Sequence, residues 1–378
     1  MNVPKLRFKE FNDKWQNYKV EEILKISNGI NKEKEFFGSG TPIINYMDVN
    51  KNELISHNIV KGLVIANSKE LETFNVKKGD ILFTRTSETS DEIGLSSSVI
   101  ENIDKCIFSG FILKGTQTKQ FIHPYFGGYY FRNPKMRKEI IKHSSITTRA
   151  LTSGSLLSQM SISIPTIIEQ EKIGKTLSLL DKKIELQTKK IEDLKLFKKG
   201  LLQKQYNYIK DKNLVELSYI ANIYQPQTIS QNKLDNGKYF VFGANGIIGK
   251  YSRYNHKQKQ ITISCRGENS GKVNITPEKC WITGNSMVLN TDNNYNVDKI
   301  YLKCVLDSQN LRYLISGSGQ PQITRNVILK HKIPLLPILE QKKFRNPFIK
   351  LDLKIHLEET KVNKLLDIKK GLMQDMFV

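Results

Sequence analysis

The chain has 378 residues, and its 59 Lys and Arg residues outnumber its 37 Asp and Glu residues, which gives a formal net charge of +22. This excess of positive charge suits a nucleic-acid partner, although a generally lysine-rich composition would give the same total. The sequence contains no run of 18 apolar residues, and residues 1–9 lack the apolar core of a signal peptide. It therefore predicts neither a membrane span nor secretion, and we expect a cytoplasmic protein.

Residues 1–165 are long enough for an independent domain with its own apolar core. Turn signals separate β-branched and aromatic runs, which predicts a mixed domain with strands at 41–46, 80–84 and 107–113. Two polar loops, TRTSETS and SSITTRALTSG, carry arginine beside Ser and Thr, the side chains that reach bases and phosphates. The candidate DNA-binding residues of this domain are Arg85, Thr86, Ser87, Thr147, Thr148 and Arg149.

Residues 166–206 predict one long amphipathic helix. Apolar residues recur at alternating steps of four and three from Ile173 to Leu201, with charged residues between them. Ile164-Pro165 ends the domain, and Glu169 lies in the opening turn, where the helix dipole favours an acid. At 1.5 Å per residue a helix from Glu169 to Tyr206 is roughly 57 Å long, too long to bury its apolar stripe against a compact domain. It needs a partner of equal length.

Residues 207–213 (NYIKDKN) form a polar linker, and residues 214–336 are a second predicted mixed domain, with strands at 239–243, 260–264 and 281–289. Two segments resemble the first domain: 260–267 resembles 79–86, and WITG at 281–284 resembles IFSG at 107–110. Each domain therefore has a strand that leads to an arginine in a polar loop. Because Asn and Gln pair with adenine and Arg with guanine, the candidate residues here are Arg266, Asn269, Lys272, Gln320, Gln322 and Arg325.

The last segment, residues 337–378, repeats the first helix. Shifted by 171 positions, 166–206 aligns with 337–377 without a gap, and 16 of the 41 pairs are identical. This duplication predicts a pseudo-two-fold molecule in which the two long helices pair with each other. Pro347 replaces Thr176 inside the second copy, which predicts either a kink or a new helix start with Asn346 as its cap.

Both copies share the segment Lys-Lys-Gly-Leu, which we interpret as a surface for docking a partner. Its residues are Lys198, Lys199, Gly200 and Leu201 in the first helix and Lys369, Lys370, Gly371 and Leu372 in the second. The glycine costs about 1 kcal/mol against alanine inside a helix, and both the close approach of another backbone and a frayed helix end explain it. Two copies of one docking surface imply two copies of the partner.

The sequence offers no recognisable catalytic or metal site. Its four cysteines form no CxxC pair and its six histidines form no HExxH motif, so we expect buried thiols instead of zinc ligands. Neither Gly-Lys pair belongs to a phosphate-binding loop, and the Asn/Asp-Pro-Pro-Tyr/Phe tetrapeptide of methyltransferases does not occur. A single-chain nuclease or methyltransferase with an unrecognised site remains an alternative, whereas a plain coiled-coil scaffold would not need two basic domains.

Two basic domains alternate with two repeated helices, each opened by an Ile-Pro…Glu-Gln element at 164–170 and 333–341. This organisation resembles the specificity subunit of type I restriction-modification enzymes. GDILFTRT at 79–86, GANG at 243–246 and GQPQIT at 319–324 support the resemblance, which covers nearly the whole chain. The resemblance implies an α+β fold, in which two target recognition domains alternate with two long helices that pair as an antiparallel coiled coil.

The resemblance also implies a non-catalytic bacterial subunit whose domains each read one half of a split, asymmetric sequence in double-stranded DNA. Its implied partners are two methyltransferase subunits, docked on the helices, and restriction/translocase subunits. S-adenosylmethionine, ATP and Mg2+ would then belong to those partners. For this chain itself we expect no cofactor, no metal and no membrane.

Overall fold

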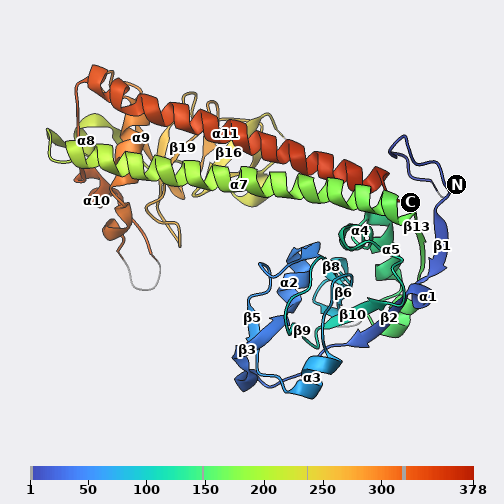
Figure 1. Cartoon of the computed structure of the whole chain (residues 1–378). Helices are drawn as coiled ribbons and strands as arrows, with labels where there is room; N and C mark the ends of the chain where they lie inside the picture. Colours follow the sequence, from blue (N-terminus) through green and yellow to red (C-terminus); the bar gives the residue numbers. More distant parts are fainter. Residues whose placement is uncertain (1–2, 147–148, 236, 317–320) are drawn as a thin grey trace. The chain divides into compact units, whose positions relative to one another are not determined.

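The chain folds into two compact units, and two long helices contribute to both. The computed structural model describes residues 3–146, 149–235, 237–316 and 321–378. Unit 1 comprises Met1–Thr188 with Thr360–Val378, and unit 2 comprises Lys189–Glu359. Helix α7 (Ile167–Ile209) begins in unit 1 and ends in unit 2, whereas helix α11 (Ile338–Asp375) begins in unit 2 and ends in unit 1 (Figure 1).

The first domain, in unit 1, is a mixed α+β structure. Its strands are β1 (Gln16–Lys19), β2 (Leu24–Asn28), β3 (Phe37–Ile44), β4 (Leu54–Ile55), β5 (Gly62–Val64), β6 (Ile81–Thr84), β7 (Thr86–Ser87), β8 (Ser96–Val99), β9 (Ile107–Phe108), β10 (Ile112–Gln117), β11 (Ser145–Ile146), β12 (Ala150–Leu151) and β13 (Ser161–Ile164). Its helices are α1 (Val20–Ile23), α2 (Tyr46–Lys51), α3 (Ser68–Thr73), α4 (Pro124–Tyr130), α5 (Pro134–Lys142) and α6 (Gly154–Ser158), with 3-10 turns η1 (Lys34–Phe36) and η2 (Ser90–Glu92).

The second domain, in unit 2, is smaller and built in the same way. Its strands are β14 (Leu214–Glu216), β15 (Asn222–Tyr224), β16 (Tyr239–Gly243), β17 (Gly246–Tyr251), β18 (Ile261–Ser264), β19 (Val273–Ile275), β20 (Trp281–Ile282), β21 (Ser286–Asn290) and β22 (Lys332–Pro334). Its helices are α8 (Leu217–Ile220), α9 (Lys299–Ser308) and α10 (Arg325–Leu329), with 3-10 turns η3 (Gln231–Lys233) and η4 (Leu311–Leu314).

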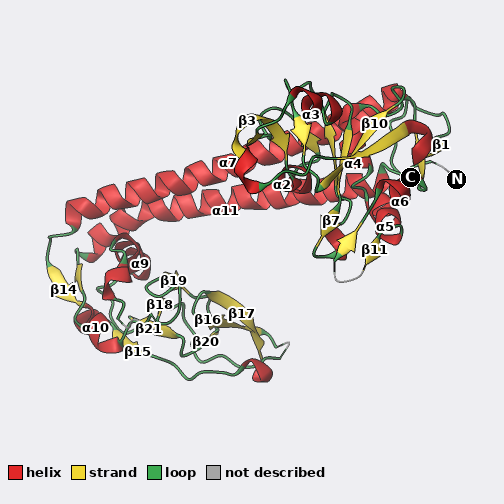
Figure 2. Ribbon diagram, turned by 90° about the horizontal axis from the view of Figure 1, so that it is seen from below, coloured by secondary structure: helices red, strands yellow, loops and turns green. Residues whose placement is uncertain are grey.

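The two domains share one sheet topology. The central sheet of the first domain has the order β2-β10-β6-β8-β4, and that of the second has the order β15-β21-β18-β19. A second sheet, β5-β3-β9 in the first domain and β17-β16-β20 in the second, combines one antiparallel and one parallel pairing in both cases (Figure 2). The equivalences predicted from sequence, β6 with β18 and β9 with β20, are confirmed. The central sheet of the first domain has one extra strand, β4, parallel to β8, and the first domain also has a three-stranded sheet with the order β11-β12-β7.

In each domain, one predicted strand was wrong, and the error is the same in both. The segments 107–113 and 281–289 were each predicted as a single strand, but each forms two strands that belong to different sheets. A tight turn separates them: the backbone N–H of Ile112 donates to Ser109 (3.0 Å), and that of Ser286 donates to Thr283 (3.0 Å). Both strands are largely buried, so apolar residues stand on each side of the turn and the hydrophobic pattern alone does not show that the two strands belong to different sheets.

The ends of the first long helix also depart from the prediction. Helix α7 continues to Ile209, beyond the predicted end at Tyr206, and so shortens the predicted linker 207–213. The reason is packing, because Ile209 is buried in the apolar core of unit 2 together with Leu202 and Phe348. Helix α11 runs through Pro347 without a break, so the predicted new start at Asn346 was wrong. The proline removes one helical hydrogen bond but does not end the helix.

One buried glutamine joins α7 to the first domain. The side-chain oxygen of Gln170 accepts a hydrogen bond from the backbone N–H of His123 (2.8 Å), at the start of α4. Its amide nitrogen donates to the carbonyl oxygens of Phe121 and Pro165 (both 2.9 Å). Because the Gln170 side chain satisfies three backbone groups at once, it fixes the angle at which the helix leaves the domain.

Gln341, the counterpart of Gln170 in the second repeat, makes the same three bonds in unit 2. Its oxygen accepts from the backbone N–H of Asp298 (2.8 Å), the N-cap residue of α9, and its nitrogen donates to Asn296 and Leu336 (both 2.7 Å). Gln170 is 1% exposed and Gln341 is 0% exposed. The conserved bonding explains why the repeat keeps a glutamine next to its first acid.

Within each unit, α7 and α11 lie side by side in opposite directions (Figure 1). An ion pair joins Lys198 to Asp352 in unit 2, and the pair formed by the repeat-related residues joins Lys369 to Asp181 in unit 1 (2.6 Å). Such reciprocity is what an antiparallel pair of identical segments produces, since each copy offers the same lysine to the same acid of the other. The predicted antiparallel pairing and pseudo-two-fold duplication are thereby confirmed.

Candidate nucleic-acid interface

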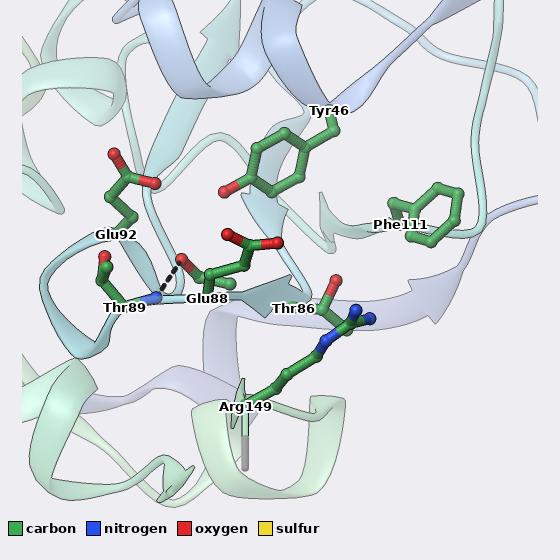
Figure 3. Close-up of a pocket in the computed structure, with 8 residues that line it drawn as sticks. Tyr46, Thr86, Glu88, Thr89, Glu92, Phe111 and Arg149 are labelled. Carbon is green, nitrogen blue, oxygen red and sulfur yellow. Dashed lines mark hydrogen bonds between the residues drawn. The ribbon is translucent and has the colours of Figure 1, made fainter.

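The structure brings two of the predicted loops of the first domain together. Arg85 follows β6, and the next two residues, Thr86 and Ser87, form β7. Strand β12 pairs antiparallel with β7, with Ala150 opposite Ser87 and Leu151 opposite Thr86, so the preceding residue Arg149 follows in register opposite Glu88. The Arg149 side chain extends toward Thr86 in Figure 3. The predicted residues Thr147 and Thr148 lie outside the described residues. The remaining candidates of this domain therefore belong to one surface.

This surface surrounds a hollow of about 450 Å3 (Figure 3). Three of the candidate DNA-binding residues, Thr86, Ser87 and Arg149, line it. Five residues that were not selected from the sequence also line it: Tyr46, Glu88, Thr89, Glu92 and Phe111. Phe111 is 61% exposed, unusual for an aromatic ring between two buried strands. Glu88 lies in the TRTSETS loop that the sequence already indicated, so it could have been selected as a candidate. Tyr46 and Phe111 come from distant segments and could not.

Arg85 differs from Arg149, because its guanidinium is partly used inside the domain. One of its Nη atoms lies 3.5 Å from the carbonyl oxygen of Gly110, at the limit of a hydrogen bond. Its backbone N–H donates to Phe111 (2.9 Å), and its carbonyl oxygen accepts from Thr152 (3.0 Å). These bonds hold the loop that follows β6 against the start of β10. We therefore assign Arg85 chiefly to positioning and Arg149 to the open surface.

A buried ion pair joins β10 to the residue that precedes β6. The Nζ atom of Lys114 is 3.8 Å from a carboxylate oxygen of Asp80, which also accepts from the backbone N–H of Lys77 (2.8 Å). Burial raises the pKa of Asp80 and lowers the pKa of Lys114. Shifted pKa values of this kind occur in active sites, but here the pair fixes the turn that begins β6.

The second domain forms a similar loop arrangement from different side chains. Arg266 follows β18 and forms an isolated antiparallel bridge with Gln322. The backbone N–H of Gly267 donates to Pro321 (3.1 Å), and that of Ile323 donates to Cys265 (2.9 Å). Two loops predicted separately, CRGENSGK and GQPQITRNV, are thus joined, and Arg266 and Gln322 are exposed.

The other candidates of the second domain lie apart from this pair. Asn269 and Lys272 line a hollow of about 270 Å3 with Asp307, Asn310 and Arg312. Arg325 lies at the first position of α10, and its Nε donates to the carbonyl oxygen of Ile223 (2.6 Å). It lines another hollow, next to asparagine residues of β15 and β21. Gln320 lies outside the described residues.

The predicted docking residues are not equally available. Lys369 is held by Asp181 and Glu53 (2.6 and 2.9 Å), and Lys198 is paired with Asp352. Leu201 and Leu372 are half-buried against the apolar cores. Lys199 and Lys370 are exposed, and no atom lies within 4 Å of a Cβ built on Gly200 or Gly371. Gly200 is well inside α7, so a frayed end does not explain it, and no backbone of the described chain approaches either glycine.

The described residues contain no cluster of His, Cys, Asp and Glu that could hold a metal ion. All four cysteines are buried and unpaired, as predicted, and burial raises the pKa of Cys106 and of Cys304 to about 12. Among the described helices, none is long and apolar enough to cross a membrane.

Comparisons with known proteins agree with this organisation. The family model of the type I restriction modification DNA specificity domain matches residues 12–196 and again 209–367. The chain is 26% identical over 412 residues to a protein named type I restriction enzyme MjaX specificity subunit from Methanocaldococcus jannaschii, covering 98% of this chain and 95% of that protein. Two solved structures share the fold. One is the S subunit of a type I restriction-modification system from M. genitalium, with a TM-score of 0.63 at 18% sequence identity. The alignment covers 100% of this chain and 99% of that subunit. A chain from a study of complex assembly and conformational transition in a type I R-M system has a TM-score of 0.60 at 15% identity, covering 96% and 97%.

Two matched specificity domains on a duplicated fold define a DNA-recognition protein, not a catalytic one. The chain belongs to the family of type I restriction-modification specificity subunits. Such a subunit works within a complex, and the alternative of a single-chain nuclease or methyltransferase is not retained.

Proposed function

We propose that this subunit reads a split, asymmetric site in double-stranded DNA, with one half-site for each domain. The observation that carries the proposal is that the two domains share a topology but present different side chains at the same place. The loop after β6 carries Arg85 and Glu88, and the loop after β18 carries Arg266 and Asn269 at the aligned positions, so that glutamate is replaced by asparagine. The neighbouring segment contributes Arg149 in the first domain and Gln322 in the second. Because base edges are distinguished by their pattern of donors and acceptors, different side chains on equivalent loops select different sequences.

We further propose that α7 and α11 dock two identical methyltransferase subunits through an exposed apolar stripe. Ile168, Leu186 and Phe197 in α7 are each more than half exposed. Separations of 18 (186 − 168) and 29 (197 − 168) residues place them on one face of the helix, within about 20° at roughly 100° per residue. The repeat-related residues Leu339, Leu357 and Ile368 of α11 are exposed in the same way.

Solvent-exposed apolar positions shared by both copies support docking, because a free helix gains nothing from keeping them. Lys199 and Lys370 replace Lys198 and Lys369 as the available cations, but at roughly 100° per residue they lie about 200° around the helix from Phe197 and Ile368, outside the stripe. Restriction/translocase subunits would join the assembly through the methyltransferase subunits or the helices. S-adenosylmethionine, ATP and Mg2+ would be bound by those partners.

Selection of DNA from a randomised pool by the reconstituted complex tests the proposal. We expect two blocks of constrained base pairs separated by a spacer of fixed length, and native mass spectrometry should find two methyltransferase subunits per chain at saturation. A single uninterrupted block would contradict the split site. One methyltransferase subunit at saturation, or unchanged affinity after Leu186→Asp and Leu357→Asp, would contradict the docking stripe. Thr188→Asp, which also adds one acid to an exposed position of α7 but lies about 200° around the helix from Leu186, is the control.

The paired helices should also act as a ruler. Removing residues 187–193 from α7 and the repeat-related residues 358–364 from α11 takes out both partners of the Lys190–Glu358 ion pair and leaves Lys198–Asp352 and Lys369–Asp181 in place. These deletions spare Leu186 and Leu357 of the stripe. One heptad is about 10 Å of helix, or about three base pairs of DNA at 3.4 Å each. We expect active variants to methylate the same half-sites with a spacer shortened by about three base pairs. An active variant that keeps the original spacing contradicts the ruler.

A further inference from the structure

The hollow of the first domain contains opposite charges that do not neutralise each other. Figure 3 shows Glu88 and Arg149 extending into the space between Tyr46 and Phe111. Among the described residues, neither side chain forms a hydrogen bond or an ion pair within 4.0 Å. A glutamate and an arginine on one surface usually pair, as Arg7 and Glu169 do in this unit at 2.7 Å. Here both groups are left free for a ligand.

The charge of the hollow excludes a phosphate as that ligand. Two carboxylates, Glu88 and Glu92, line it against one guanidinium, Arg149. Duplex DNA carries one negative charge per roughly 1.7 Å of its axis, and a phosphate oxygen would be repelled by the two carboxylates. A carboxylate can only accept hydrogen bonds at neutral pH, so its partner in DNA must be an exocyclic amino group.

The side chains then select one kind of base pair. Glutamate accepts from the N4 amino group of cytosine, and arginine donates to O6 and N7 of guanine. A C·G pair presents both groups side by side in the major groove, and Tyr46 and Phe111 supply apolar walls that shield the bonds from water. We propose that this hollow reads a C·G pair of the first half-site, with Glu88 accepting from cytosine and Arg149 donating to guanine. This inference rests on the proposed function of the two domains.

The second domain lacks the same chemistry. In the alignment of 79–86 with 260–267, continued by two residues, Asn269 takes the place of Glu88. Asn269 points to a different hollow, lined by Lys272 and Arg312. An amide both donates and accepts, so it imposes no cytosine requirement. The carboxylate is thus a specificity determinant of one half-site only.

Substitution of Glu88 in the full complex tests the inference. Affinity is measured for DNAs that carry all four base pairs at each position of the first half-site, with wild type, Glu88→Ala and Glu88→Gln. We expect wild type to require a C·G pair at one position. Both variants should lose discrimination at that position by about 5- to 150-fold and keep it elsewhere. Arg149→Lys should partly relax the same position, because the lysine ammonium lacks the planar, fixed pair of donors with which a guanidinium meets O6 and N7 of guanine.

Non-specific binding separates base reading from a general effect. Removing a carboxylate that meets no phosphate leaves the affinity for random DNA unchanged or raises it, and does not lower its dependence on salt. Glu72→Gln, an equal charge change on α3 of the same domain, is the matched control and should alter no position. Unfolding temperatures equal to wild type establish that the Glu88 variants fold.

The outcomes distinguish this inference from the proposed function. If wild type reads two half-sites but the Glu88 variants discriminate at every position as before, the hollow does not read a base and the split site stands. If Glu88→Ala and Arg149→Lys relax different positions, the single C·G pair is wrong. If wild type shows no split site, both the proposed function and this inference fail.

Discussion

The joints between helix and domain and the recognition loops have diverged at very different rates within one chain. At the joints, Gln170 and Gln341 make the same three hydrogen bonds in both units. In the loops after β6 and β18, by contrast, Glu88 of the first domain is replaced by Asn269 in the second, and the neighbouring segments contribute Arg149 and Gln322 respectively. The joint must have one geometry to orient either domain, whereas the loops must differ if the two half-sites differ.

The joints even preserve a contact whose chemistry had to be reversed. The hydroxyl of Tyr130 accepts a hydrogen bond from the backbone N–H of Ser163 (2.9 Å). In the second unit the corresponding strand residue is Pro334, which has no N–H, and the hydroxyl of Tyr301 instead donates to its carbonyl oxygen (2.8 Å). A hydroxyl group can donate or accept a hydrogen bond, so a tyrosine at this position contacts the strand backbone whether or not the strand residue has an N–H.

Breaking a joint should have the largest effect on stability. Gln170→Leu and Gln341→Leu each leave one backbone N–H and two carbonyl groups without their partner in a buried position. We expect each to lower the free energy of unfolding of its unit by roughly 3 kcal/mol, since an unsatisfied buried group costs about 1 to 3 kcal/mol. Denaturant titration measures this. If one variant is neutral while the other is severe, the joints are not equivalent.

The ion pairs between the helices sharpen the comparison, because the repeat places the same lysine in two environments. Lys369 lies between Asp181 and Glu53, which are 29% and 26% exposed, whereas Lys198 pairs with Asp352, which is 58% exposed. Lys369→Met should therefore cost about 2 kcal/mol, and Lys198→Met less than about 1 kcal/mol. Equal costs would show that the second and less exposed carboxylate partners of Lys369 add nothing to stability.

The Lys369 effect should also depend on pH. Burial raises the pKa of Glu53, but the charges of Lys369 and Arg132 outweigh it and hold the pKa below its ordinary value of 4.5. A lowered carboxyl pKa stabilises the fold above 4.5, and this contribution is lost as the pH falls through the lower, folded value. The stability difference between wild type and Lys369→Met should be full at pH 7 and should narrow below pH 4.5. A constant difference would contradict the pairing.

The glycines of the docking segment should give the smallest effect. No atom lies within 4 Å of a Cβ at Gly200 or Gly371, so alanine fits and should stabilise each helix by about 1 kcal/mol. If the glycines admit the backbone of a methyltransferase subunit, as the proposed docking implies, the same substitutions should weaken its binding. Thermal unfolding and a binding titration measure the two effects. A gain in stability with unchanged affinity would remove the glycines from the docking surface.

The helices were predictable and the recognition surface was not, for a physical reason. A periodic stripe and 16 identical pairs reveal a long helix and its copy, since both signals are local. The hollow depends on long-range pairing: β12 brings Arg149 to β7, and a tight turn at Ser109 exposes Phe111. Tyr46 was predicted at the end of a strand, but it begins α2 and thereby faces the hollow. Only the tertiary structure brings these segments together.

The most direct test of the two-domain account is a map of methylated adenines in DNA from cells that express this chain with its methyltransferase partner. The map is made for wild type, for Arg149→Ala in the first domain and for Gln322→Ala in the second. Contacts in separate domains act independently, and a good base contact discriminates by about 1 to 3 kcal/mol. We predict a split site in which Arg149→Ala relaxes base pairs of one half only and Gln322→Ala relaxes base pairs of the other half only. An uninterrupted site, or two variants that relax the same base pairs, would contradict the account.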